Sequence, residues 1–449
     1  MNRTNSSQLN DSDLYFNMQN NKSNKRLNVF TLIAFIAILS GQLLPTFGSE
    51  LGFAGNWIPF IFSGLVLLFL ALILLIYGFK SNLFSRFFII TYLIVLPIIA
   101  LWGTIISPYS VDIEGYADYF RFFVGASAFI VGYAGWQKKW INSSILITTI
   151  IFGLLLNVIL YIKFLNNPWN ELAQLYSTRT MGVGKFPGNW NYPYNFTVFA
   201  AFTCIFGFMY SFIKTKKTQR LIALFIGITG GYLVIVAQSR SALIATIITL
   251  VFSVLLLAFK SLWENSGGNF IKSVFIAVTS IFLLVFTYYY IFQLKTDRFS
   301  YYQTLLSEAD DGSLGQTRLS QTDKFFRILG DNPGSIVWGF GPSRDFPVWI
   351  ENIFIYFQRY GLIGITLMIL IPLILTALIA FKMYLKSSQK HIQFVGLGTV
   401  LFCCFIAINS LTNNIFFHYR FMVLFYVLLG VFWSYYDQFR KQNQYKEII

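Results

Sequence analysis

Long apolar blocks separated by short polar connections constrain this chain more than any other feature of its sequence. A helix needs about 20 mostly apolar residues to cross a bilayer. Only 11% of the residues are charged, against roughly a quarter in soluble globular proteins. The blocks also lack the two-residue alternation of an outer-membrane barrel. The sequence therefore predicts an all-α polytopic membrane protein with about twelve transmembrane helices, at residues 28–45, 57–79, 87–106, 117–136, 141–163, 193–213, 221–237, 241–259, 271–292, 350–381, 392–410 and 416–436.

The distribution of basic residues predicts the orientation of these helices. With the amino terminus in the cytoplasm and alternating sides, 20 basic but only five acidic residues fall on the inner side. The whole net charge of +15 therefore lies there, as the positive-inside rule requires. The basic balance is a topology signal and gives no reason to expect a nucleic-acid partner. We expect a multi-pass protein in contact with membrane lipid, with both termini in the cytoplasm.

Composition divides the chain into a tail and one membrane domain. Residues 1–27 are rich in Asn and Ser and predict a disordered cytoplasmic tail, which the single transmembrane domain 28–449 follows. The first helix lacks an Ala-x-Ala-like end, which favours an uncleaved anchor. Three cysteines inside apolar blocks indicate small core residues and no disulfide framework. Two extracytoplasmic loops are long, at 164–192 and 293–349.

The loop 293–349 predicts a helical lid at the outer membrane surface. Residues 316–329 fit an amphipathic helix, with Leu319, Phe326 and Leu329 near one stripe. The following segment 330–334 contains Gly and Pro, which end helices. Arg318 then either points inward toward the membrane domain or lies on a solvated face.

Two other outer connections carry arginines that suit phosphate. The turn 237–241 is very short and holds Arg240, whose planar fork matches phosphate geometry. The alternative for Arg240 is snorkelling to lipid headgroups. In the loop 164–192, Arg179 and Lys185 lie among glycines and can grip phosphate or sugar oxygens. The alternative there is an ordered surface loop.

A polar strip opens the block 350–381. Asn352, Tyr356 and Arg359 share one helical face, and Glu351 lies on the neighbouring stripe. Such groups are costly to expose to lipid, so the strip should face a water-filled cavity or another helix. By the same argument Arg121 should have a partner, and Asp118 is the candidate. We interpret the lone His418 as structural.

In chain order, these motifs resemble a known family. Arg318, Gly339-Phe-Gly341, Glu351-Asn352 and Tyr360-Gly-Leu-Ile-Gly364 resemble the signature of bacterial O-antigen polymerases and ligases. The segments 238–242 and 179–191 resemble two further motifs of that family, so the resemblance covers roughly residues 175–365. It implies an integral-membrane, GT-C-like glycosyltransferase of the bacterial inner membrane that inverts the anomeric centre and needs no metal or other cofactor.

The resemblance also implies the substrates. Donor and acceptor are glycans linked to undecaprenyl pyrophosphate, with a flippase and a chain-length regulator as further partners. A polymerase transfers the growing chain to another lipid-linked repeat unit, whereas a ligase transfers it to lipid A-core. Ligases commonly carry His where this chain has Glu351, which favours the polymerase. The alternatives are the ligase and, from another class, a lipid-linked oligosaccharide flippase.

The chemistry of transfer suggests roles for individual residues. Cleavage of the anomeric bond leaves negative charge on pyrophosphate, and fixed cations can stabilise it. Outside the predicted tail, which contains Asp11-Ser-Asp13, the sequence offers no Asp-x-Asp motif and no His cluster, so we expect no metal site. We expect Arg240 and Arg318 at the pyrophosphate and Glu351 as the base or sugar-orienting carboxylate. The residues expected to bind substrate are Arg179, Lys185, Arg344, Asn352, Tyr356 and Arg359.

Overall fold

Every regular element that the computed structural model describes is a helix. The described residues are 29–46, 57–111, 113–167, 170–176, 186–190, 193–213, 217–263, 316–343, 345–348, 350, 352–387 and 389–448. The elements are α2 (Val29–Leu43), α4 (Trp57–Tyr77), α5 (Leu83–Ile90), η2 (Thr91–Val95), α6 (Leu96–Ile106), α7 (Ile113–Gln137), α8 (Ser143–Asn166), α9 (Glu171–Tyr176), η3 (Gly188–Trp190), α10 (Pro193–Ile213), α11 (Lys217–Val236), α12 (Arg240–Trp263), α15 (Gln316–Asp331), α16 (Gly334–Trp338), α17 (Phe354–Ile365), η5 (Thr366–Leu370), α18 (Ile371–Lys386), α19 (Lys390–Ser410), η6 (Ile415–Phe417) and α20 (Tyr419–Ile448).

Eight helices in these ranges are long and apolar enough to cross a membrane, and two shorter apolar helices accompany them. The prediction of an all-helical, multi-pass membrane protein is thereby confirmed. The predicted block 271–292 lies outside the described residues, as do the tail 1–27 and residues 293–315 of the long loop, and each of the other blocks contains a helix.

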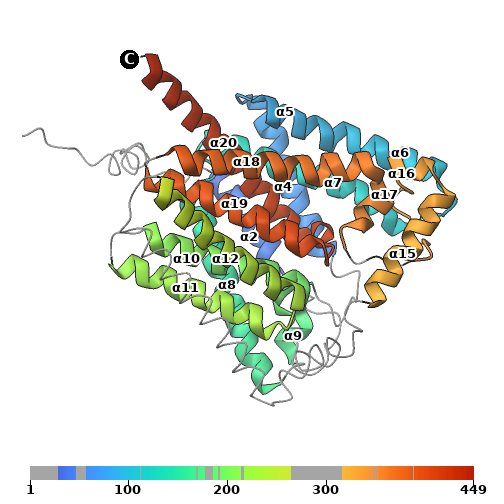
Figure 1. Ribbon diagram of the computed structural model, residues 1–449, viewed down its shortest axis with the longest axis horizontal. Helices are drawn as coiled ribbons and strands as arrows, with labels where there is room; N and C mark the ends of the chain where they lie inside the picture. The colour runs from blue at the N-terminus through green and yellow to red at the C-terminus, as the bar shows by residue number, and fades with distance from the viewer. Residues whose placement is uncertain are drawn as a thin grey trace, which may run out of the picture.

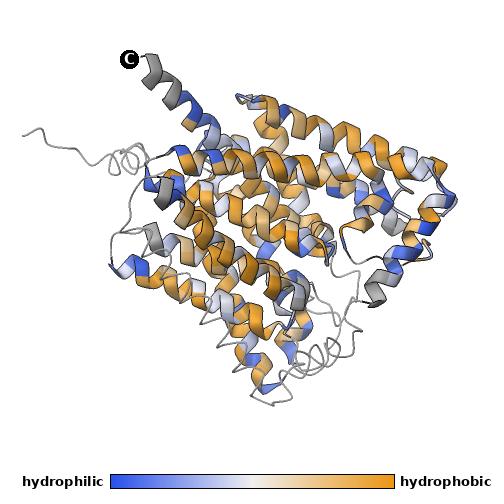
Figure 2. Cartoon of the chain, viewed as in Figure 1, coloured by the Kyte–Doolittle hydropathy of each residue, from blue (hydrophilic) through white to orange (hydrophobic). Residues whose placement is uncertain are grey.

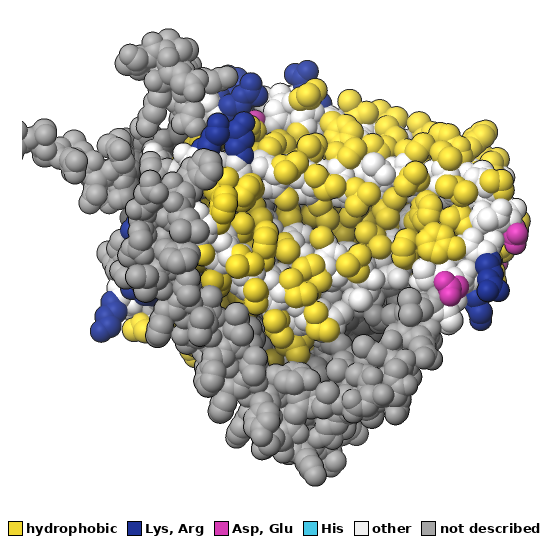
Figure 3. Space-filling model, in the orientation of Figure 1, with side chains coloured by type: hydrophobic (Ala, Val, Ile, Leu, Met, Phe, Trp, Pro, Cys, Tyr) yellow, Lys and Arg dark blue, Asp and Glu magenta, His cyan; other side chains and the backbone are white. Residues whose placement is uncertain are grey.

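The surface has the character of a protein dissolved in lipid. On one face of α4, apolar side chains such as Leu65, Phe69 and Leu72 are about half exposed. Figure 2 shows hydrophobic residues along most of the long helices, and hydrophilic residues toward their ends and on α15. In Figure 3, most Lys and Arg side chains gather at the left of the view and apolar side chains cover the middle, while acidic side chains appear at the right beside a smaller basic group. We call the left end inner and the right end outer.

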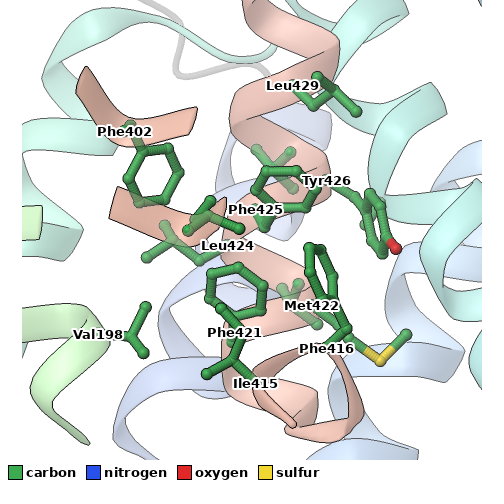
Figure 4. Packing of buried hydrophobic residues seen from close by; sticks show 14 of the residues in the cluster. Val198, Phe402, Ile415, Phe416, Phe421, Met422, Leu424, Phe425, Tyr426 and Leu429 are labelled. Atoms are coloured by element: carbon green, nitrogen blue, oxygen red, sulfur yellow. The ribbon is translucent and has the colours of Figure 1, made fainter. Parts of the chain in front are cut away.

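The core is built around α20, which runs through the bundle (Figure 1). Its aromatic side chains pack on each other and on α19, with Phe402 and Phe425 at 6.1 Å between ring centroids (Figure 4). On the other side α20 packs against α7, where Gly132 faces the backbone of Val427 and Gly430 that of Phe129. Small residues let helices in membranes approach this closely.

Two π-helical turns meet in the bundle. η2 and η5 each precede a helix with a proline in its first turn, Pro97 and Pro372. Pro372 has no N–H to donate to the carbonyl of Met368, four residues earlier. The hydroxyl of Tyr92 donates to that carbonyl instead, at 3.1 Å, and also bonds the hydroxyl of Tyr426. The arrangement satisfies a backbone group where lipid offers no substitute.

The amphipathic helix predicted at residues 316–329 exists, with a different buried stripe. α15 spans Gln316–Asp331, and the turn after it begins where Gly330 and Pro333 indicated. Phe325 and Leu329 are buried, however, while Phe326 is 45% exposed. The expected stripe through Phe326 was wrong because α15 is rotated so that Phe325 enters the aromatic surface, while Phe326 contacts its edge at Phe354. The Phe325 ring contacts Phe346, Phe354 and Phe357 at 5.8–6.3 Å.

A candidate site at the outer end of the bundle

The turn between α11 and α12 is as tight as the sequence suggested. α11 ends at Val236 and α12 begins with Arg240 itself. Gln238 has φ +53°, the left-handed conformation that reverses the chain in so few residues. Gln238 and Ser239 are buried, so the turn packs on neighbouring helices. The backbone of Arg240 is therefore fixed at the outer end.

A chain of hydrogen bonds joins this turn to the end of α19. Asn413 donates from Nδ2 to Ser241 Oγ at 2.6 Å and to Asn409 Oδ1 at 2.7 Å. Ser241 follows Arg240 directly, and Asn409 lies in the last turn of α19. The sequence interpretation gave Asn413 no role. Its i, i+4 spacing from Asn409 is the signal that links the two.

The same end of α19 also holds the start of α17. The N–H of Ile353 donates to the Ser410 carbonyl at 2.9 Å. Asn352 accepts from the N–H of Phe354 at 3.0 Å through Oδ1 and so serves one of the free N–H groups of the helix start. α17 begins at Phe354, so the expectation that Asn352 already lies inside the helix was wrong.

The polar strip on α17 faces other helices of the bundle. Arg359 donates to Asp118 on α7, and Arg121 donates to the other oxygen of the same carboxylate. The Tyr360 hydroxyl donates to Asp118 at 3.2 Å. The expected Arg121–Asp118 pair is thus confirmed, and Arg359, expected at the substrate, is a second partner of that fully buried carboxylate. Tyr356 is also fully buried, with its ring 5.8 Å from that of Phe416.

Close backbone contact between glycines holds the outer segment onto α17. Gly361 has φ +63° inside α17, and a Cβ there would clash with the carbonyl of Val337 in α16. Gly339 has φ +76°, and its Cβ would lie 2.5 Å from the backbone of Arg359. The Phe340 N–H donates to the Gln358 carbonyl at 2.7 Å. Only glycine allows such an approach at positive φ, which gives two of the family-like motifs a packing cause.

This contact also determines where α15 lies. α16 is joined to α15 by a short turn, and the Phe325 ring rests on the first turns of α17. Figure 1 shows α15, α16 and α17 together at the outer end. Arg318 is in the first turn of α15, and position 318 falls on the helical face of Phe325, seven residues later.

A second polar cluster, centred on Arg420, escaped the sequence interpretation. Arg420 is fully buried at the start of α20 and donates to the carbonyls of Gly41, Gln42 and Leu44 at 2.6–3.1 Å. Asn189 also donates to the Gln42 carbonyl, at 2.5 Å, and bonds Asn157 of α8. An arginine in the otherwise apolar block 416–436 was the signal that could have indicated it.

The carbonyl groups at the end of α2 accept hydrogen bonds from this cluster and from Tyr176 of α9. The Tyr176 hydroxyl donates to the Leu43 carbonyl at 2.7 Å. Burial raises the pKa of Tyr176, so the hydroxyl keeps its proton at neutral pH. Each free carbonyl from Gly41 to Leu44 therefore has a side-chain donor. The cluster ties α2, α8, α9 and α20 together.

Several predicted site residues remain predictions. Arg179, Lys185, Arg344 and Glu351 lie outside the described residues. Within the described part of the chain, no three His, Cys, Asp or Glu residues gather as a metal site would require. No protein-family model matches the chain, and no curated protein matches it in sequence.

Proposed function

We propose that this chain is a glycosyltransferase that polymerises oligosaccharide repeat units carried on undecaprenyl pyrophosphate, at the outer face of a bacterial inner membrane. The support is the resemblance of its motifs, in order, to O-antigen polymerases and ligases, together with its multi-pass helical fold. The architecture would be GT-C-like, with residues 316–348 as part of the lid. Glu351 in place of the histidine common in ligases favours the polymerase.

One observation carries most of the proposal. The chain Ser241–Asn413–Asn409 and the Ile353–Ser410 bond tie the turn that begins with Arg240 to the start of α17. α15, which contains Arg318, rests on those same first turns of α17. Segments more than 170 residues apart in sequence therefore meet at one end of the bundle. An enzyme acting on a lipid-linked substrate needs its groups at this level of the membrane.

The proposed reaction uses cations in fixed positions. The acceptor hydroxyl oxygen forms a bond to the anomeric carbon as the bond from that carbon to the pyrophosphate oxygen breaks. The electron pair leaves with the pyrophosphate, where Arg240 and Arg318 stabilise the charge, and Glu351 takes the hydroxyl proton. Attack opposite the leaving group inverts the anomeric centre. Each well-placed donor stabilises the transition state by about 3 kcal/mol, so losing one slows transfer on the order of 100-fold.

Variants of these arginines test the proposal in a strain that carries this gene, deleted and complemented at equal protein level. We expect Arg240→Ala and Arg318→Ala each to leave surface glycan of a single repeat unit. Arg318→Lys should also fail, because an ammonium lacks the guanidinium fork. Arg327→Ala is the matched control, since Arg327 lies exposed on the same helix and should keep the full ladder.

The gel ladder also separates the alternatives. A full-length ladder in both alanine variants would refute the assigned role. Bare core in the deletion strain would indicate a ligase, and repeat units stranded on the inner face would indicate a flippase.

A further inference from the structure

Two buried asparagines mark a part of the outer end that the proposed chemistry leaves unused. Asn409 is fully buried and Asn413 is 5% exposed, one turn apart at the end of α19. Asn413 Nδ2 donates to both Ser241 and Asn409. Among the described residues, Asn409 Nδ2 has no acceptor and Ser410 Oγ has no hydrogen-bond partner. The cluster therefore holds a free donor and a free hydroxyl.

Such groups are costly in a membrane domain. A buried amide or hydroxyl loses its bonds to water on folding, and an unmade replacement destabilises the fold. Leucine has nearly the shape of asparagine and would pack at position 409 without that cost. Buried polar groups that find no partner in the protein are commonly satisfied by bound water or by a ligand. A bound water or ligand would satisfy the free groups of this cluster.

The chemistry of the cluster suggests which ligand it suits. Asn409, Ser410, Asn413 and Ser241 are neutral, and they offer amide and hydroxyl groups that both donate and accept. These groups match sugar hydroxyls and acetamido groups, whereas a phosphate would favour cations. The side chains of Asn409 and Ser410 are buried, and the next residue, Leu411, is 63% exposed.

The position of the cluster next to Arg240 indicates which sugar of the donor it would bind. Ser241 directly follows Arg240, which the proposed function assigns to the pyrophosphate. In the lipid-linked donor, the first sugar is bonded directly to the pyrophosphate. We propose that Asn409 and Ser410, with Asn413 holding Asn409, bind the first sugar of the lipid-linked donor. This inference rests on the proposed function and assigns it a specificity-determining site.

Binding measurements with and without sugar test the inference. The probes are sugar-free undecaprenyl pyrophosphate and the undecaprenyl-pyrophosphate-linked repeat unit extracted from the host, each titrated against purified protein in nanodiscs. We expect Asn409→Leu and Ser410→Ala to weaken binding of the repeat unit about 3–10-fold, the effect of one neutral hydrogen bond. Affinity for the sugar-free lipid should stay unchanged.

Ser434→Ala is the matched control. Ser434 is also fully buried, and its hydroxyl likewise has no partner among the described residues, but it lies far along α20 toward the inner end. We expect it to alter neither affinity. Ser410→Ala is mild enough to be informative if Asn409→Leu fails to fold.

The outcomes separate the two proposals. If the wild type binds both probes and no variant discriminates between them, the cluster holds water only and the inference is wrong. Equal weakening of both probes by Ser410→Ala would also refute it. If the wild type binds neither probe, the proposed function fails and the inference fails with it.

Discussion

Replacing Arg420 with methionine should destabilise the whole bundle. The guanidinium lies at the end of α2, where a helix has free carbonyls and the negative end of its dipole. Pro45 has no N–H to donate to the carbonyl of Gly41, four residues before it, and Arg420 supplies that donor. The helix end thus depends on a side chain more than 370 residues away.

The expected loss in the free energy of unfolding follows from the hydrogen bonds that remain after Arg420→Met. The Gln42 carbonyl keeps its bond from Asn189, whereas those of Gly41 and Leu44 lose the donor that Arg420 gave them. A buried acceptor left without a donor costs roughly 1–3 kcal/mol, so the two together cost about 2–6 kcal/mol. Methionine no longer buries a charge, which offsets part of this cost. We expect a net loss of about 3 kcal/mol.

Thermal unfolding in detergent measures this loss. Cys204 and Cys403 are free and buried, so a thiol-reactive dye reports unfolding when it reaches them. For a chain of this length, about 3 kcal/mol corresponds to a fall in Tm of roughly 3–6 °C. Arg420→Lys should fall about half as far, because one ammonium cannot replace a fork that spans three carbonyls.

The control is Arg440→Met, on the exposed part of the same helix, which should stay within about 0.5 kcal/mol of the wild type. If Arg420→Met unfolds at the temperature of the wild type, the carbonyls of α2 do not depend on this arginine and the reasoning is wrong.

Two further variants use the same melt. Gly361→Ala should destabilise the fold by at least about 2 kcal/mol, because the new Cβ meets the Val337 carbonyl at positive φ. The control Gly398→Ala should be neutral or stabilising, since a Cβ there meets nothing within 4 Å. Equal melting temperatures for the two variants would contradict this. Asp118→Asn should lower the free energy of unfolding by about 3 kcal/mol, because it removes the carboxylate that pairs with Arg359. The double variant with Arg359→Met should lose little more than Asp118→Asn alone. If the two single losses add in full, the pair is not coupled.

Local pattern predicted the helices and failed where partners are distant in sequence. The apolar blocks, the lid helix and the i, i+3 pair of Arg121 with Asp118 all follow from spacing alone. The buried stripe of α15 did not, because Phe325 and Phe326 differ only in the surface that each meets. Nor did the partners of Arg420, since no local pattern relates it to the end of α2. The start of α17 was misjudged because Asn352, which precedes the helix and accepts from the Phe354 N–H, fits the same helical spacing as Tyr356 and Arg359.

The family-like motifs now divide into two physical kinds. The glycines at 339, 341 and 361 are required by backbone contact, since a Cβ at any of them would clash with a neighbouring chain segment. Their replacement should therefore remove activity and stability together. Arg240 and Arg318 are the residues that the proposed function places at the pyrophosphate, so their replacement should remove the proposed transfer and leave the melt unchanged. A motif match by itself cannot distinguish these kinds. The decisive measurement is therefore a variant that loses transfer while its melt stays that of the wild type.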